Sequence, residues 1–275
     1  MSDIDAHVHV YTDDFDRYPL APGYSPEQMK PRRFLPEDIL SHANRCGVSR
    51  VVLVQMSYYG ADNSYMLEVM RTHPGVFGGI GIVDWRGPDP DKAMLALADQ
   101  GVRGFRIYPK DVPLERWLDG DGFQRMFTCA AEHNLAMCPL IGVDGLPALE
   151  RMCETHPDAP VVIDHLCRIG AGKQPITDEQ INALCAVARF PRTMVKVSAF
   201  YALGQGPPHD DLAPLVQAVV KAFGAHRLMW ASDCPYQVER GTYEDGIAPI
   251  RQRYPFLTDD DREWILRKTA ERMFF

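Results

Sequence analysis

Two histidines near the start of the chain, His7 and His9, are separated by the apolar residue Val8. They lie in the run 4–10, whose apolar and β-branched residues predict a strand. Because residues i and i+2 of a strand point to the same face, both imidazoles are expected to share one side of a sheet. Such a pair can bind a metal ion or make hydrogen bonds to a polarised carbonyl group. Two partly buried histidines with a purely structural role are the plain alternative.

Two further candidates end later apolar runs. Asp233 follows the run 227–231, and His165 ends the run 161–165. A carboxylate at such a place can ligate a metal or act as a general base toward water, although Asp233 could also cap a helix. Three strands that each deliver a histidine or an aspartate are harder to obtain by chance than one. We therefore predict a catalytic group of His7, His9, His165 and Asp233, in which His7, His9 and Asp233 are the ligands if a metal is bound.

Two arginines are candidates for binding an anionic substrate. Arg106 lies near the end of the run 102–107. A guanidinium inside a barrel needs a carboxylate partner, which either the protein or a ligand can supply. Arg168 follows His165 by three residues, and an ordinary surface position explains it equally well.

Eight short apolar runs alternate with helical patterns along the whole chain. The runs cover residues 4–10, 50–55, 76–83, 102–107, 135–141, 161–165, 193–197 and 227–231. The helical patterns cover residues 36–46, 63–73, 91–100, 122–133, 146–156, 177–189, 212–223 and 243–254, and a last helix begins at Thr258. This order predicts an α/β fold, a (β/α)8 TIM barrel that forms one domain over residues 1–275. An open doubly wound sheet is the alternative, but the Gly-rich loop typical of that fold does not follow the first run.

The predicted barrel explains how distant residues can form one site. In this fold the active site lies at the carboxyl ends of the strands, where the histidines and Asp233 are expected to meet. The connection 11–35 is long and contains four prolines and several aromatic residues. Connections of this length are usually functional or disordered, and we predict a lid over the barrel mouth.

Composition narrows the classes of partner. The 275-residue chain has a formal net charge of −8, which argues against nucleic acid and anionic membranes as partners. Its seven cysteines form no CxxC pair, and the first residues lack the apolar segment of a signal peptide. No apolar run approaches the length of a membrane span. We expect a cytoplasmic protein with reduced thiols and a small anionic substrate, and we expect a homodimer, as in many barrels of this kind.

Short motifs in this order resemble the amidohydrolase superfamily, specifically its amidohydrolase-related (amidohydrolase 2) branch. That branch contains 2-pyrone-4,6-dicarboxylate lactonase, sugar lactonases and, more distantly, metal-dependent decarboxylases. The motifs are Asp5-Ala6-His7-Val8-His9, Tyr24-Ser25-Pro26, Val54-Gln55, Gly60-Ala61-Asp62-Asn63, Gly101-Val102-Arg103-Gly104-Phe105-Arg106, Val162-Ile163-Asp164-His165 with Arg168, Lys196-Val197-Ser198 and Ser232-Asp233-Cys234-Pro235.

The resemblance implies a hydrolase that opens a small carboxylated lactone from the breakdown of aromatic compounds or sugar acids. Asp233 would activate the water, and the three histidines would polarise the lactone carbonyl or stabilise the oxyanion. The residues implied to hold substrate oxygens are Arg106, Tyr24, Ser57, Arg168, Tyr58 and Asn63.

Two departures from the family pattern affect the expected substrate and cofactor. The dicarboxylate lactonases carry further arginines after the fourth and seventh strands, where this chain has residues 107–110 and 199–202; Lys110 could replace one arginine. The lysine and histidine that bind metals on strands four and five of other members are missing, so we expect no metal and keep zinc as the minor case. The alternatives are a zinc-dependent decarboxylase or hydratase, and a barrel that binds a ligand without catalysis.

Overall fold

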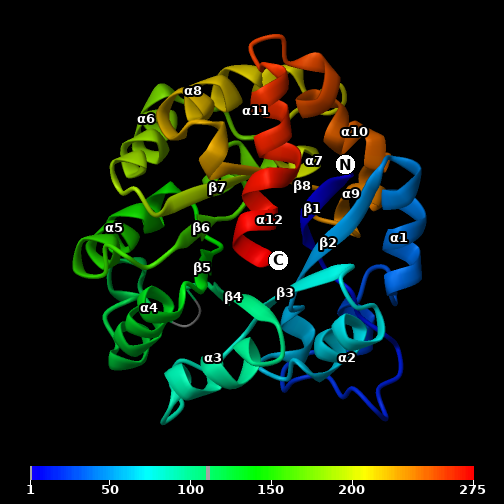
Figure 1. The fold of residues 1–275 in the computed structure, drawn as a ribbon, viewed down its shortest axis with the longest axis vertical. Coiled ribbons are helices and arrows are strands. Elements are labelled where there is room, and N and C mark those ends of the chain that lie inside the picture. Colours follow the sequence, from blue (N-terminus) through cyan, green and yellow to red (C-terminus); the bar gives the residue numbers. More distant parts are fainter. Residues whose placement is uncertain (1, 110–111) are drawn as a thin grey trace.

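The computed structural model describes residues 2–109 and 112–275, so Lys110 lies outside the described residues. Eight parallel strands form one sheet in the order β1 to β8, as predicted (Figure 1). The strands are β1 (Asp3–Val8), β2 (Val48–Val54), β3 (Phe77–Gly81), β4 (Val102–Ile107), β5 (Ala136–Pro139), β6 (Val161–Ile163), β7 (Thr193–Ser198) and β8 (Leu228–Ala231).

Helices lie between the strands on the outside of the sheet, which confirms the (β/α)8 barrel (Figure 1). The helices are α1 (Pro36–Arg45), α2 (Ser64–Thr72), α3 (Pro90–Ala98), α4 (Asp121–His133), α5 (Leu146–Thr155), α6 (Asp178–Ala186), α7 (Phe200–Leu203), α8 (Ala213–Phe223), α9 (Tyr236–Arg240), α10 (Tyr243–Ala248), α11 (Asp259–Glu263) and α12 (Thr269–Phe274). The sequence patterns did not predict the short helices α7 and α9, because four or five residues are too few to show a helical period.

The seam between β1 and β8 closes the barrel and fixes the strand that carries the first two histidines. The Asp233 amide donates to the His7 carbonyl at 2.9 Å, and the His9 amide donates to the Cys234 carbonyl at 2.8 Å. Buried Asp5 supports the seam, because its carboxylate accepts hydrogen bonds from the Ser232 amide at 2.9 Å and the Tyr243 hydroxyl at 2.8 Å. The pairing of β1 with β2 changes register between Asp5 and Val8, beside the two histidines.

The amino-terminal end of the barrel is closed by the last helix. Strand residues such as Ile4, Val52 and Met229 form a buried apolar cluster with Met273 and Phe274 of α12. Gly78 at the start of β3 leaves room for this helix, since a Cβ atom there would lie 2.9 Å from the Phe274 carbonyl oxygen. The last helix therefore fills the amino-terminal end of the barrel interior, below the histidines.

The long connection after β1 packs against the segment that follows β2. The Ala21 amide donates to the Tyr58 carbonyl at 2.8 Å, and the Tyr58 hydroxyl donates to the Gln28 carbonyl at 3.1 Å. The rings of Tyr11 and Tyr24 both contact the Tyr58 ring edge-on. These contacts hold the connection beside the barrel mouth, and its role as a lid stays a prediction.

Two further sequence expectations concern cysteines and membranes. All seven cysteines are free thiols, and most of them are buried. Within the described ranges, no helix has the length and apolar character needed to cross a membrane.

Candidate active site

A cavity of about 600 Å³ opens at the carboxyl ends of the strands. The residues that follow each of the eight strands contribute to its lining. Among the described lining residues are His9, Gln55, Ser57, Ile82, Arg106, Tyr108, Leu140, His165, Arg168, Lys173, Tyr201, Asp233, Tyr236 and Arg240. This is the place at which the fold holds its active sites.

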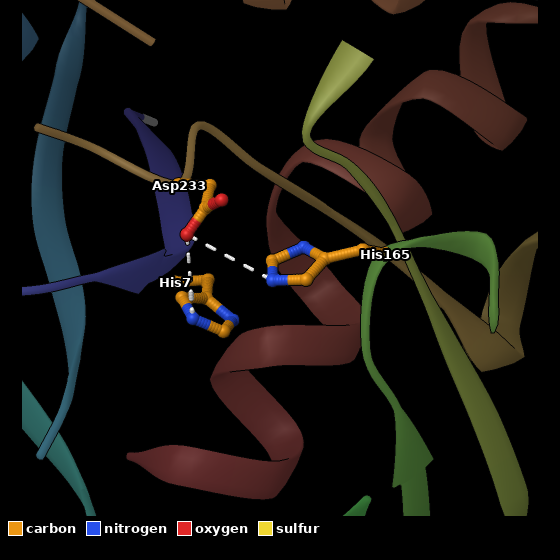
Figure 2. A group of neighbouring side chains, drawn as sticks. All are labelled: His7, His165 and Asp233. Carbon is orange, nitrogen blue, oxygen red and sulfur yellow. Dashed lines mark ion pairs between the residues drawn. The ribbon is translucent and has the colours of Figure 1, made fainter. Parts of the chain in front are cut away.

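The four predicted catalytic residues converge at the base of this cavity. Asp233 Oδ1 lies 3.6 Å from His7 Nε2, 3.6 Å from His9 Nε2 and 3.8 Å from His165 Nε2. Figure 2 shows His7 and His165 both facing the Asp233 carboxylate. All four side chains are buried, and His7 is completely so. The sequence prediction that three strands deliver these residues to one point agrees with this geometry.

Strained turns after β6, β7 and β8 aim several of these side chains. His165, Arg168, Ala199 and Asp233 all have positive φ angles between 53° and 65°. Residues with a Cβ atom rarely adopt this conformation, and such strain gathers at functional sites. The turns bring His165 and Asp233 back over the end of the barrel.

The hydrogen bonds of the three imidazoles determine which ring nitrogen can accept. His9 Nδ1 lies 2.8 Å from the Val54 carbonyl, which can only accept, so this nitrogen carries the proton. The Ser198 hydroxyl donates to the Lys196 carbonyl at 3.4 Å, so it accepts from His165 Nδ1, which lies 2.9 Å away. Burial lowers the pKa of His9 and that of His165 to about 3, so both rings are neutral. Their Nε2 atoms therefore direct lone pairs toward Asp233.

His7 differs, because a donor-only cation faces each of its ring nitrogens. Arg106 Nη2 lies 2.9 Å from His7 Nε2, and Lys196 Nζ lies 3.2 Å from His7 Nδ1, which also faces Asp164 Oδ1 at 3.3 Å. A neutral ring accepts at one nitrogen only, so one of the two cations donates to it and the other nitrogen carries the proton. Burial and the charge of Lys196 lower the pKa of His7 well below its ordinary value. His9 and His165 thus accept at Nε2, whereas the sequence led us to expect donors toward a substrate carbonyl; Arg106 is the donor beside them.

A buried charge cluster lies directly below the histidines. Asp164 Oδ1 is 3.0 Å from Lys196 Nζ, and Asp164 Oδ2 is 3.1 Å from Arg106 Nη2. Asp164 and Lys196 are completely buried, and Arg106 is 8% exposed. Burial acts to raise the pKa of Asp164, but Lys196 and Arg106 outweigh it and hold that pKa well below its usual range. The carboxylate partner that a buried Arg106 requires is therefore Asp164 of the protein itself.

Asp233 has the properties of a general base that works near neutral pH. Burial raises the pKa of Asp233 to about 7, against a hydrogen bond from Tyr201 that lowers it. The Tyr201 hydroxyl donates to Asp233 Oδ2 at 2.6 Å, which leaves Oδ1 facing the histidines. A base is most effective when its pKa lies close to the working pH.

The expected substrate ligands divide into two groups. Ser57, Arg106 and Arg168 line the cavity, whereas Tyr24, Tyr58 and Asn63 are not among its lining residues. The Asn63 side chain accepts from the Ile82 amide and donates to the Ile82 carbonyl, each at 2.9 Å. The expected contact of Asn63 with substrate is therefore corrected: its amide group links the connection after β2 to the connection after β3.

Sequence reasoning did not select Lys196 and Tyr201 as site residues. A lysine inside the apolar run 193–197 was a usable signal, because its position two residues before Ser198 places both on one face of the strand. Tyr201 carried no such signal, since the unpredicted helix α7 positions it.

The donor atoms match a metal site in spacing but not in electrostatics. His7, His165 and Asp233 each offer one ligand atom, and these atoms lie within 4.8 Å of one another. Ligands bound to zinc at about 2.0–2.2 Å in a tetrahedron are separated by about 3.3 Å, close to the distances found here. However, the Arg106 guanidinium already lies 2.9 Å from His7 Nε2, beside the nitrogen that would bind the metal. The residues therefore do not fit a metal while Arg106 keeps this position.

Comparisons with known proteins agree with this architecture. The chain is 32% identical to an L-fucono-1,5-lactonase of Burkholderia ambifaria, over 88% of this chain and 83% of that protein. It is 25% identical to a 4-sulfomuconolactone hydrolase of Rhizobium radiobacter, over 84% of this chain and 75% of that protein.

Solved structures show the same fold. A Pseudomonas putida protein provisionally assigned as a 2-pyrone-4,6-dicarboxylic acid hydrolase has a TM-score of 0.80 at 25% identity, over 99% of this chain and 97% of that one. An amidohydrolase of Burkholderia multivorans with bound zinc has a TM-score of 0.79 at 20% identity, over 99% of each chain. The sequence profile of the Amidohydrolase family matches residues 4–275. The chain therefore belongs to the amidohydrolase family.

Proposed function

We propose that this protein is a lactonase that hydrolyses a small cyclic ester with a water molecule activated by Asp233. One observation carries the proposal: a carboxylate with a pKa of about 7 lies at the base of the cavity, surrounded by three imidazole nitrogens and one guanidinium. The names of the related lactone hydrolases support the same reaction class.

The first step is the attack of water on the lactone carbonyl carbon. A water molecule beside Asp233 Oδ1 gives one proton to the carboxylate and can donate its other hydrogen to the Nε2 of His9 or His165. The Tyr201 hydroxyl holds the second carboxylate oxygen, so Oδ1 stays directed toward the water. Proton transfer to a positioned base typically accelerates such a step by about 10²–10⁴-fold.

The second step opens the ring. The negative charge that develops on the carbonyl oxygen needs a fixed donor, and Arg106 at the cavity wall supplies one beside the histidines. When the tetrahedral intermediate collapses, the carbon–oxygen bond of the ring breaks. The leaving oxygen takes the proton from Asp233, which returns the carboxylate to its starting state and yields a hydroxy acid.

The rim of the cavity favours a substrate with an additional acidic group. Arg168, Lys173 and Arg240 are exposed and line the cavity, whereas Asp233 is the one acidic residue among its described lining residues. Arg240 is held over the ring of Tyr201, with its guanidinium carbon 5.5 Å from the ring centre. We assign these three side chains to the carboxylate or sulfonate of an anionic lactone.

A panel of lactones at pH 7–8 tests the function. Each acidic lactone is paired with its methyl ester or amide, so that both compounds present the same ring. We expect ring opening, followed by proton release, and a kcat/KM at least about tenfold higher for the acidic member, as one charge-assisted contact would give. Failure to hydrolyse any lactone would refute the proposed reaction, whereas faster hydrolysis of the neutral members would refute only the anionic substrate.

A zinc-dependent decarboxylase or hydratase of the same family is the second candidate, favoured by the spacing of His7, His165 and Asp233. Metal analysis of the purified protein distinguishes the two. Stoichiometric zinc, together with activity that a chelator abolishes and zinc restores, would support the second candidate and contradict the first.

The cytoplasmic location and the homodimer expected from the sequence stay proposals. Fractionation of the producing cells and sedimentation of the purified protein measure them directly.

A further inference from the structure

The guanidinium of Arg106 lies among groups that would otherwise suit a metal ion. Its Nη2 atom is 2.9 Å from His7 Nε2 and 3.1 Å from Asp164 Oδ2. A guanidinium has no acceptor atom, so its N–H group can only donate to His7 Nε2 and cannot stand beside an ion bound there without repulsion. His7 would need a free lone pair on this nitrogen in order to bind a metal.

A second fixed cation contacts the other side of the same imidazole. Lys196 Nζ lies 3.2 Å from His7 Nδ1 and is completely buried. One carboxylate, Asp164, balances the two cations inside the barrel. A divalent ion at His7 Nε2 would add two positive charges beside this cluster, where solvent screens their repulsion poorly.

We propose that Arg106 takes the place of a metal ion in this barrel. It occupies the position beside His7 Nε2, excludes divalent cations and provides the positive charge beside the reacting carbonyl. This inference deepens the proposed function, but zinc binding tests it without any substrate, so the two can fail separately.

The test compares zinc affinity in the wild type and in Arg106→Met, measured by competition with a chromophoric chelator. Methionine keeps much of the side-chain volume and removes the charge. We expect the variant to bind one zinc ion at least about 100-fold more tightly, because the position beside His7 Nε2 is freed and a repulsive charge is lost. Arg168→Met removes an arginine from the exposed rim and is the matched control, with no expected change in zinc affinity.

Arg106→Met leaves buried Asp164 with Lys196 as its one cationic partner, which could prevent folding. A second pair of variants keeps the proposal testable in that case. Arg106→Met with Asp164→Asn removes both charges and keeps an acceptor for His7 Nδ1, and it should show the same gain in affinity. Arg106→Lys keeps the positive charge and should gain less than about tenfold.

The location of the new site is tested by adding His7→Ala to the Arg106→Met variant. We expect this change to abolish the gain. Equal zinc affinity in the wild type and in folded Arg106→Met protein would overturn the proposal, and so would a gain that survives the loss of His7.

Discussion

The two ends of the barrel differ in the polarity of the residues that line them. At the amino-terminal end, aliphatic residues of the strands pack against Met273 and Phe274, and helix α12 closes the interior. At the carboxyl end, three neutral histidines, an aspartate and a guanidinium surround an open cavity. Between them lies the buried charge layer of Asp164 and Lys196.

The amino-terminal end therefore mainly stabilises the fold, whereas the carboxyl end mainly serves the chemistry. The apolar end buries hydrocarbon, which stabilises the fold. The carboxyl end holds unfavourable features, namely left-handed residues, buried charges and a carboxylate with a raised pKa. Proteins retain such features mainly where they serve function. Substitutions at the amino-terminal end should therefore change the free energy of unfolding, and substitutions at the carboxyl end should change turnover.

The largest effect on turnover is expected from Asp233→Asn. The amide keeps the shape of the side chain but cannot take a proton from water, so kcat should fall by about 10³-fold. Stability should stay equal or rise, because the buried carboxylate is removed. Initial rates and thermal melting measure the two quantities. A variant with wild-type turnover would show that Asp233 is not the base.

The opposite result is expected from Phe274→Ala at the closed end. Loss of a buried phenyl ring should lower the free energy of unfolding by about 3–5 kcal/mol. Phe274 does not line the cavity, and Lys196, whose Nζ lies 5.8 Å from the centre of its ring, stands between it and His7, so kcat should change by less than about twofold. Phe275→Ala is the matched control, since Phe275 is 45% exposed and its loss should cost about 0.5 kcal/mol or less. Denaturant unfolding compares the two, and a large loss of turnover in the folded Phe274 variant would contradict the separation.

A smaller effect is expected from Tyr201→Phe, which removes the hydrogen bond that lowers the pKa of Asp233. The base works when deprotonated, so in the wild type kcat/KM should rise with pH through about 7 and level off above it. A hydrogen bond to a charged group contributes about 1.5–3 kcal/mol, so the variant's rise should move up by about one to two pH units. Tyr236→Phe, which also lines the cavity, serves as control. An unmoved profile would indicate that another group titrates.

The smallest effect is expected from Arg168→Met at the exposed rim. Solvent screens this charge, so KM for an acidic lactone should rise only about two- to fivefold, and kinetics with a neutral lactone should not change. Steady-state kinetics with both compounds at two salt concentrations provide the measurement. An equal change for both compounds would mean that Arg168 supports the fold of the rim and does not recognise the acid.

The sequence by itself determined the barrel and the main catalytic group. Alternating apolar runs and helical patterns are local properties of the chain, and parallel strands bring their carboxyl ends to one place. For that reason the order of the runs is enough to predict that His7, His9, His165 and Asp233 meet at one end of the barrel.

Only the tertiary structure decided how these residues act. The direction of each imidazole lone pair depends on partners distant in sequence, such as Val54 for His9 and Arg106 for His7. The ion pairs of Asp164 with Lys196 and Arg106 likewise join three strands. Tautomers, pKa shifts and the competition between a guanidinium and a metal arise from packing across the barrel, which no local pattern records.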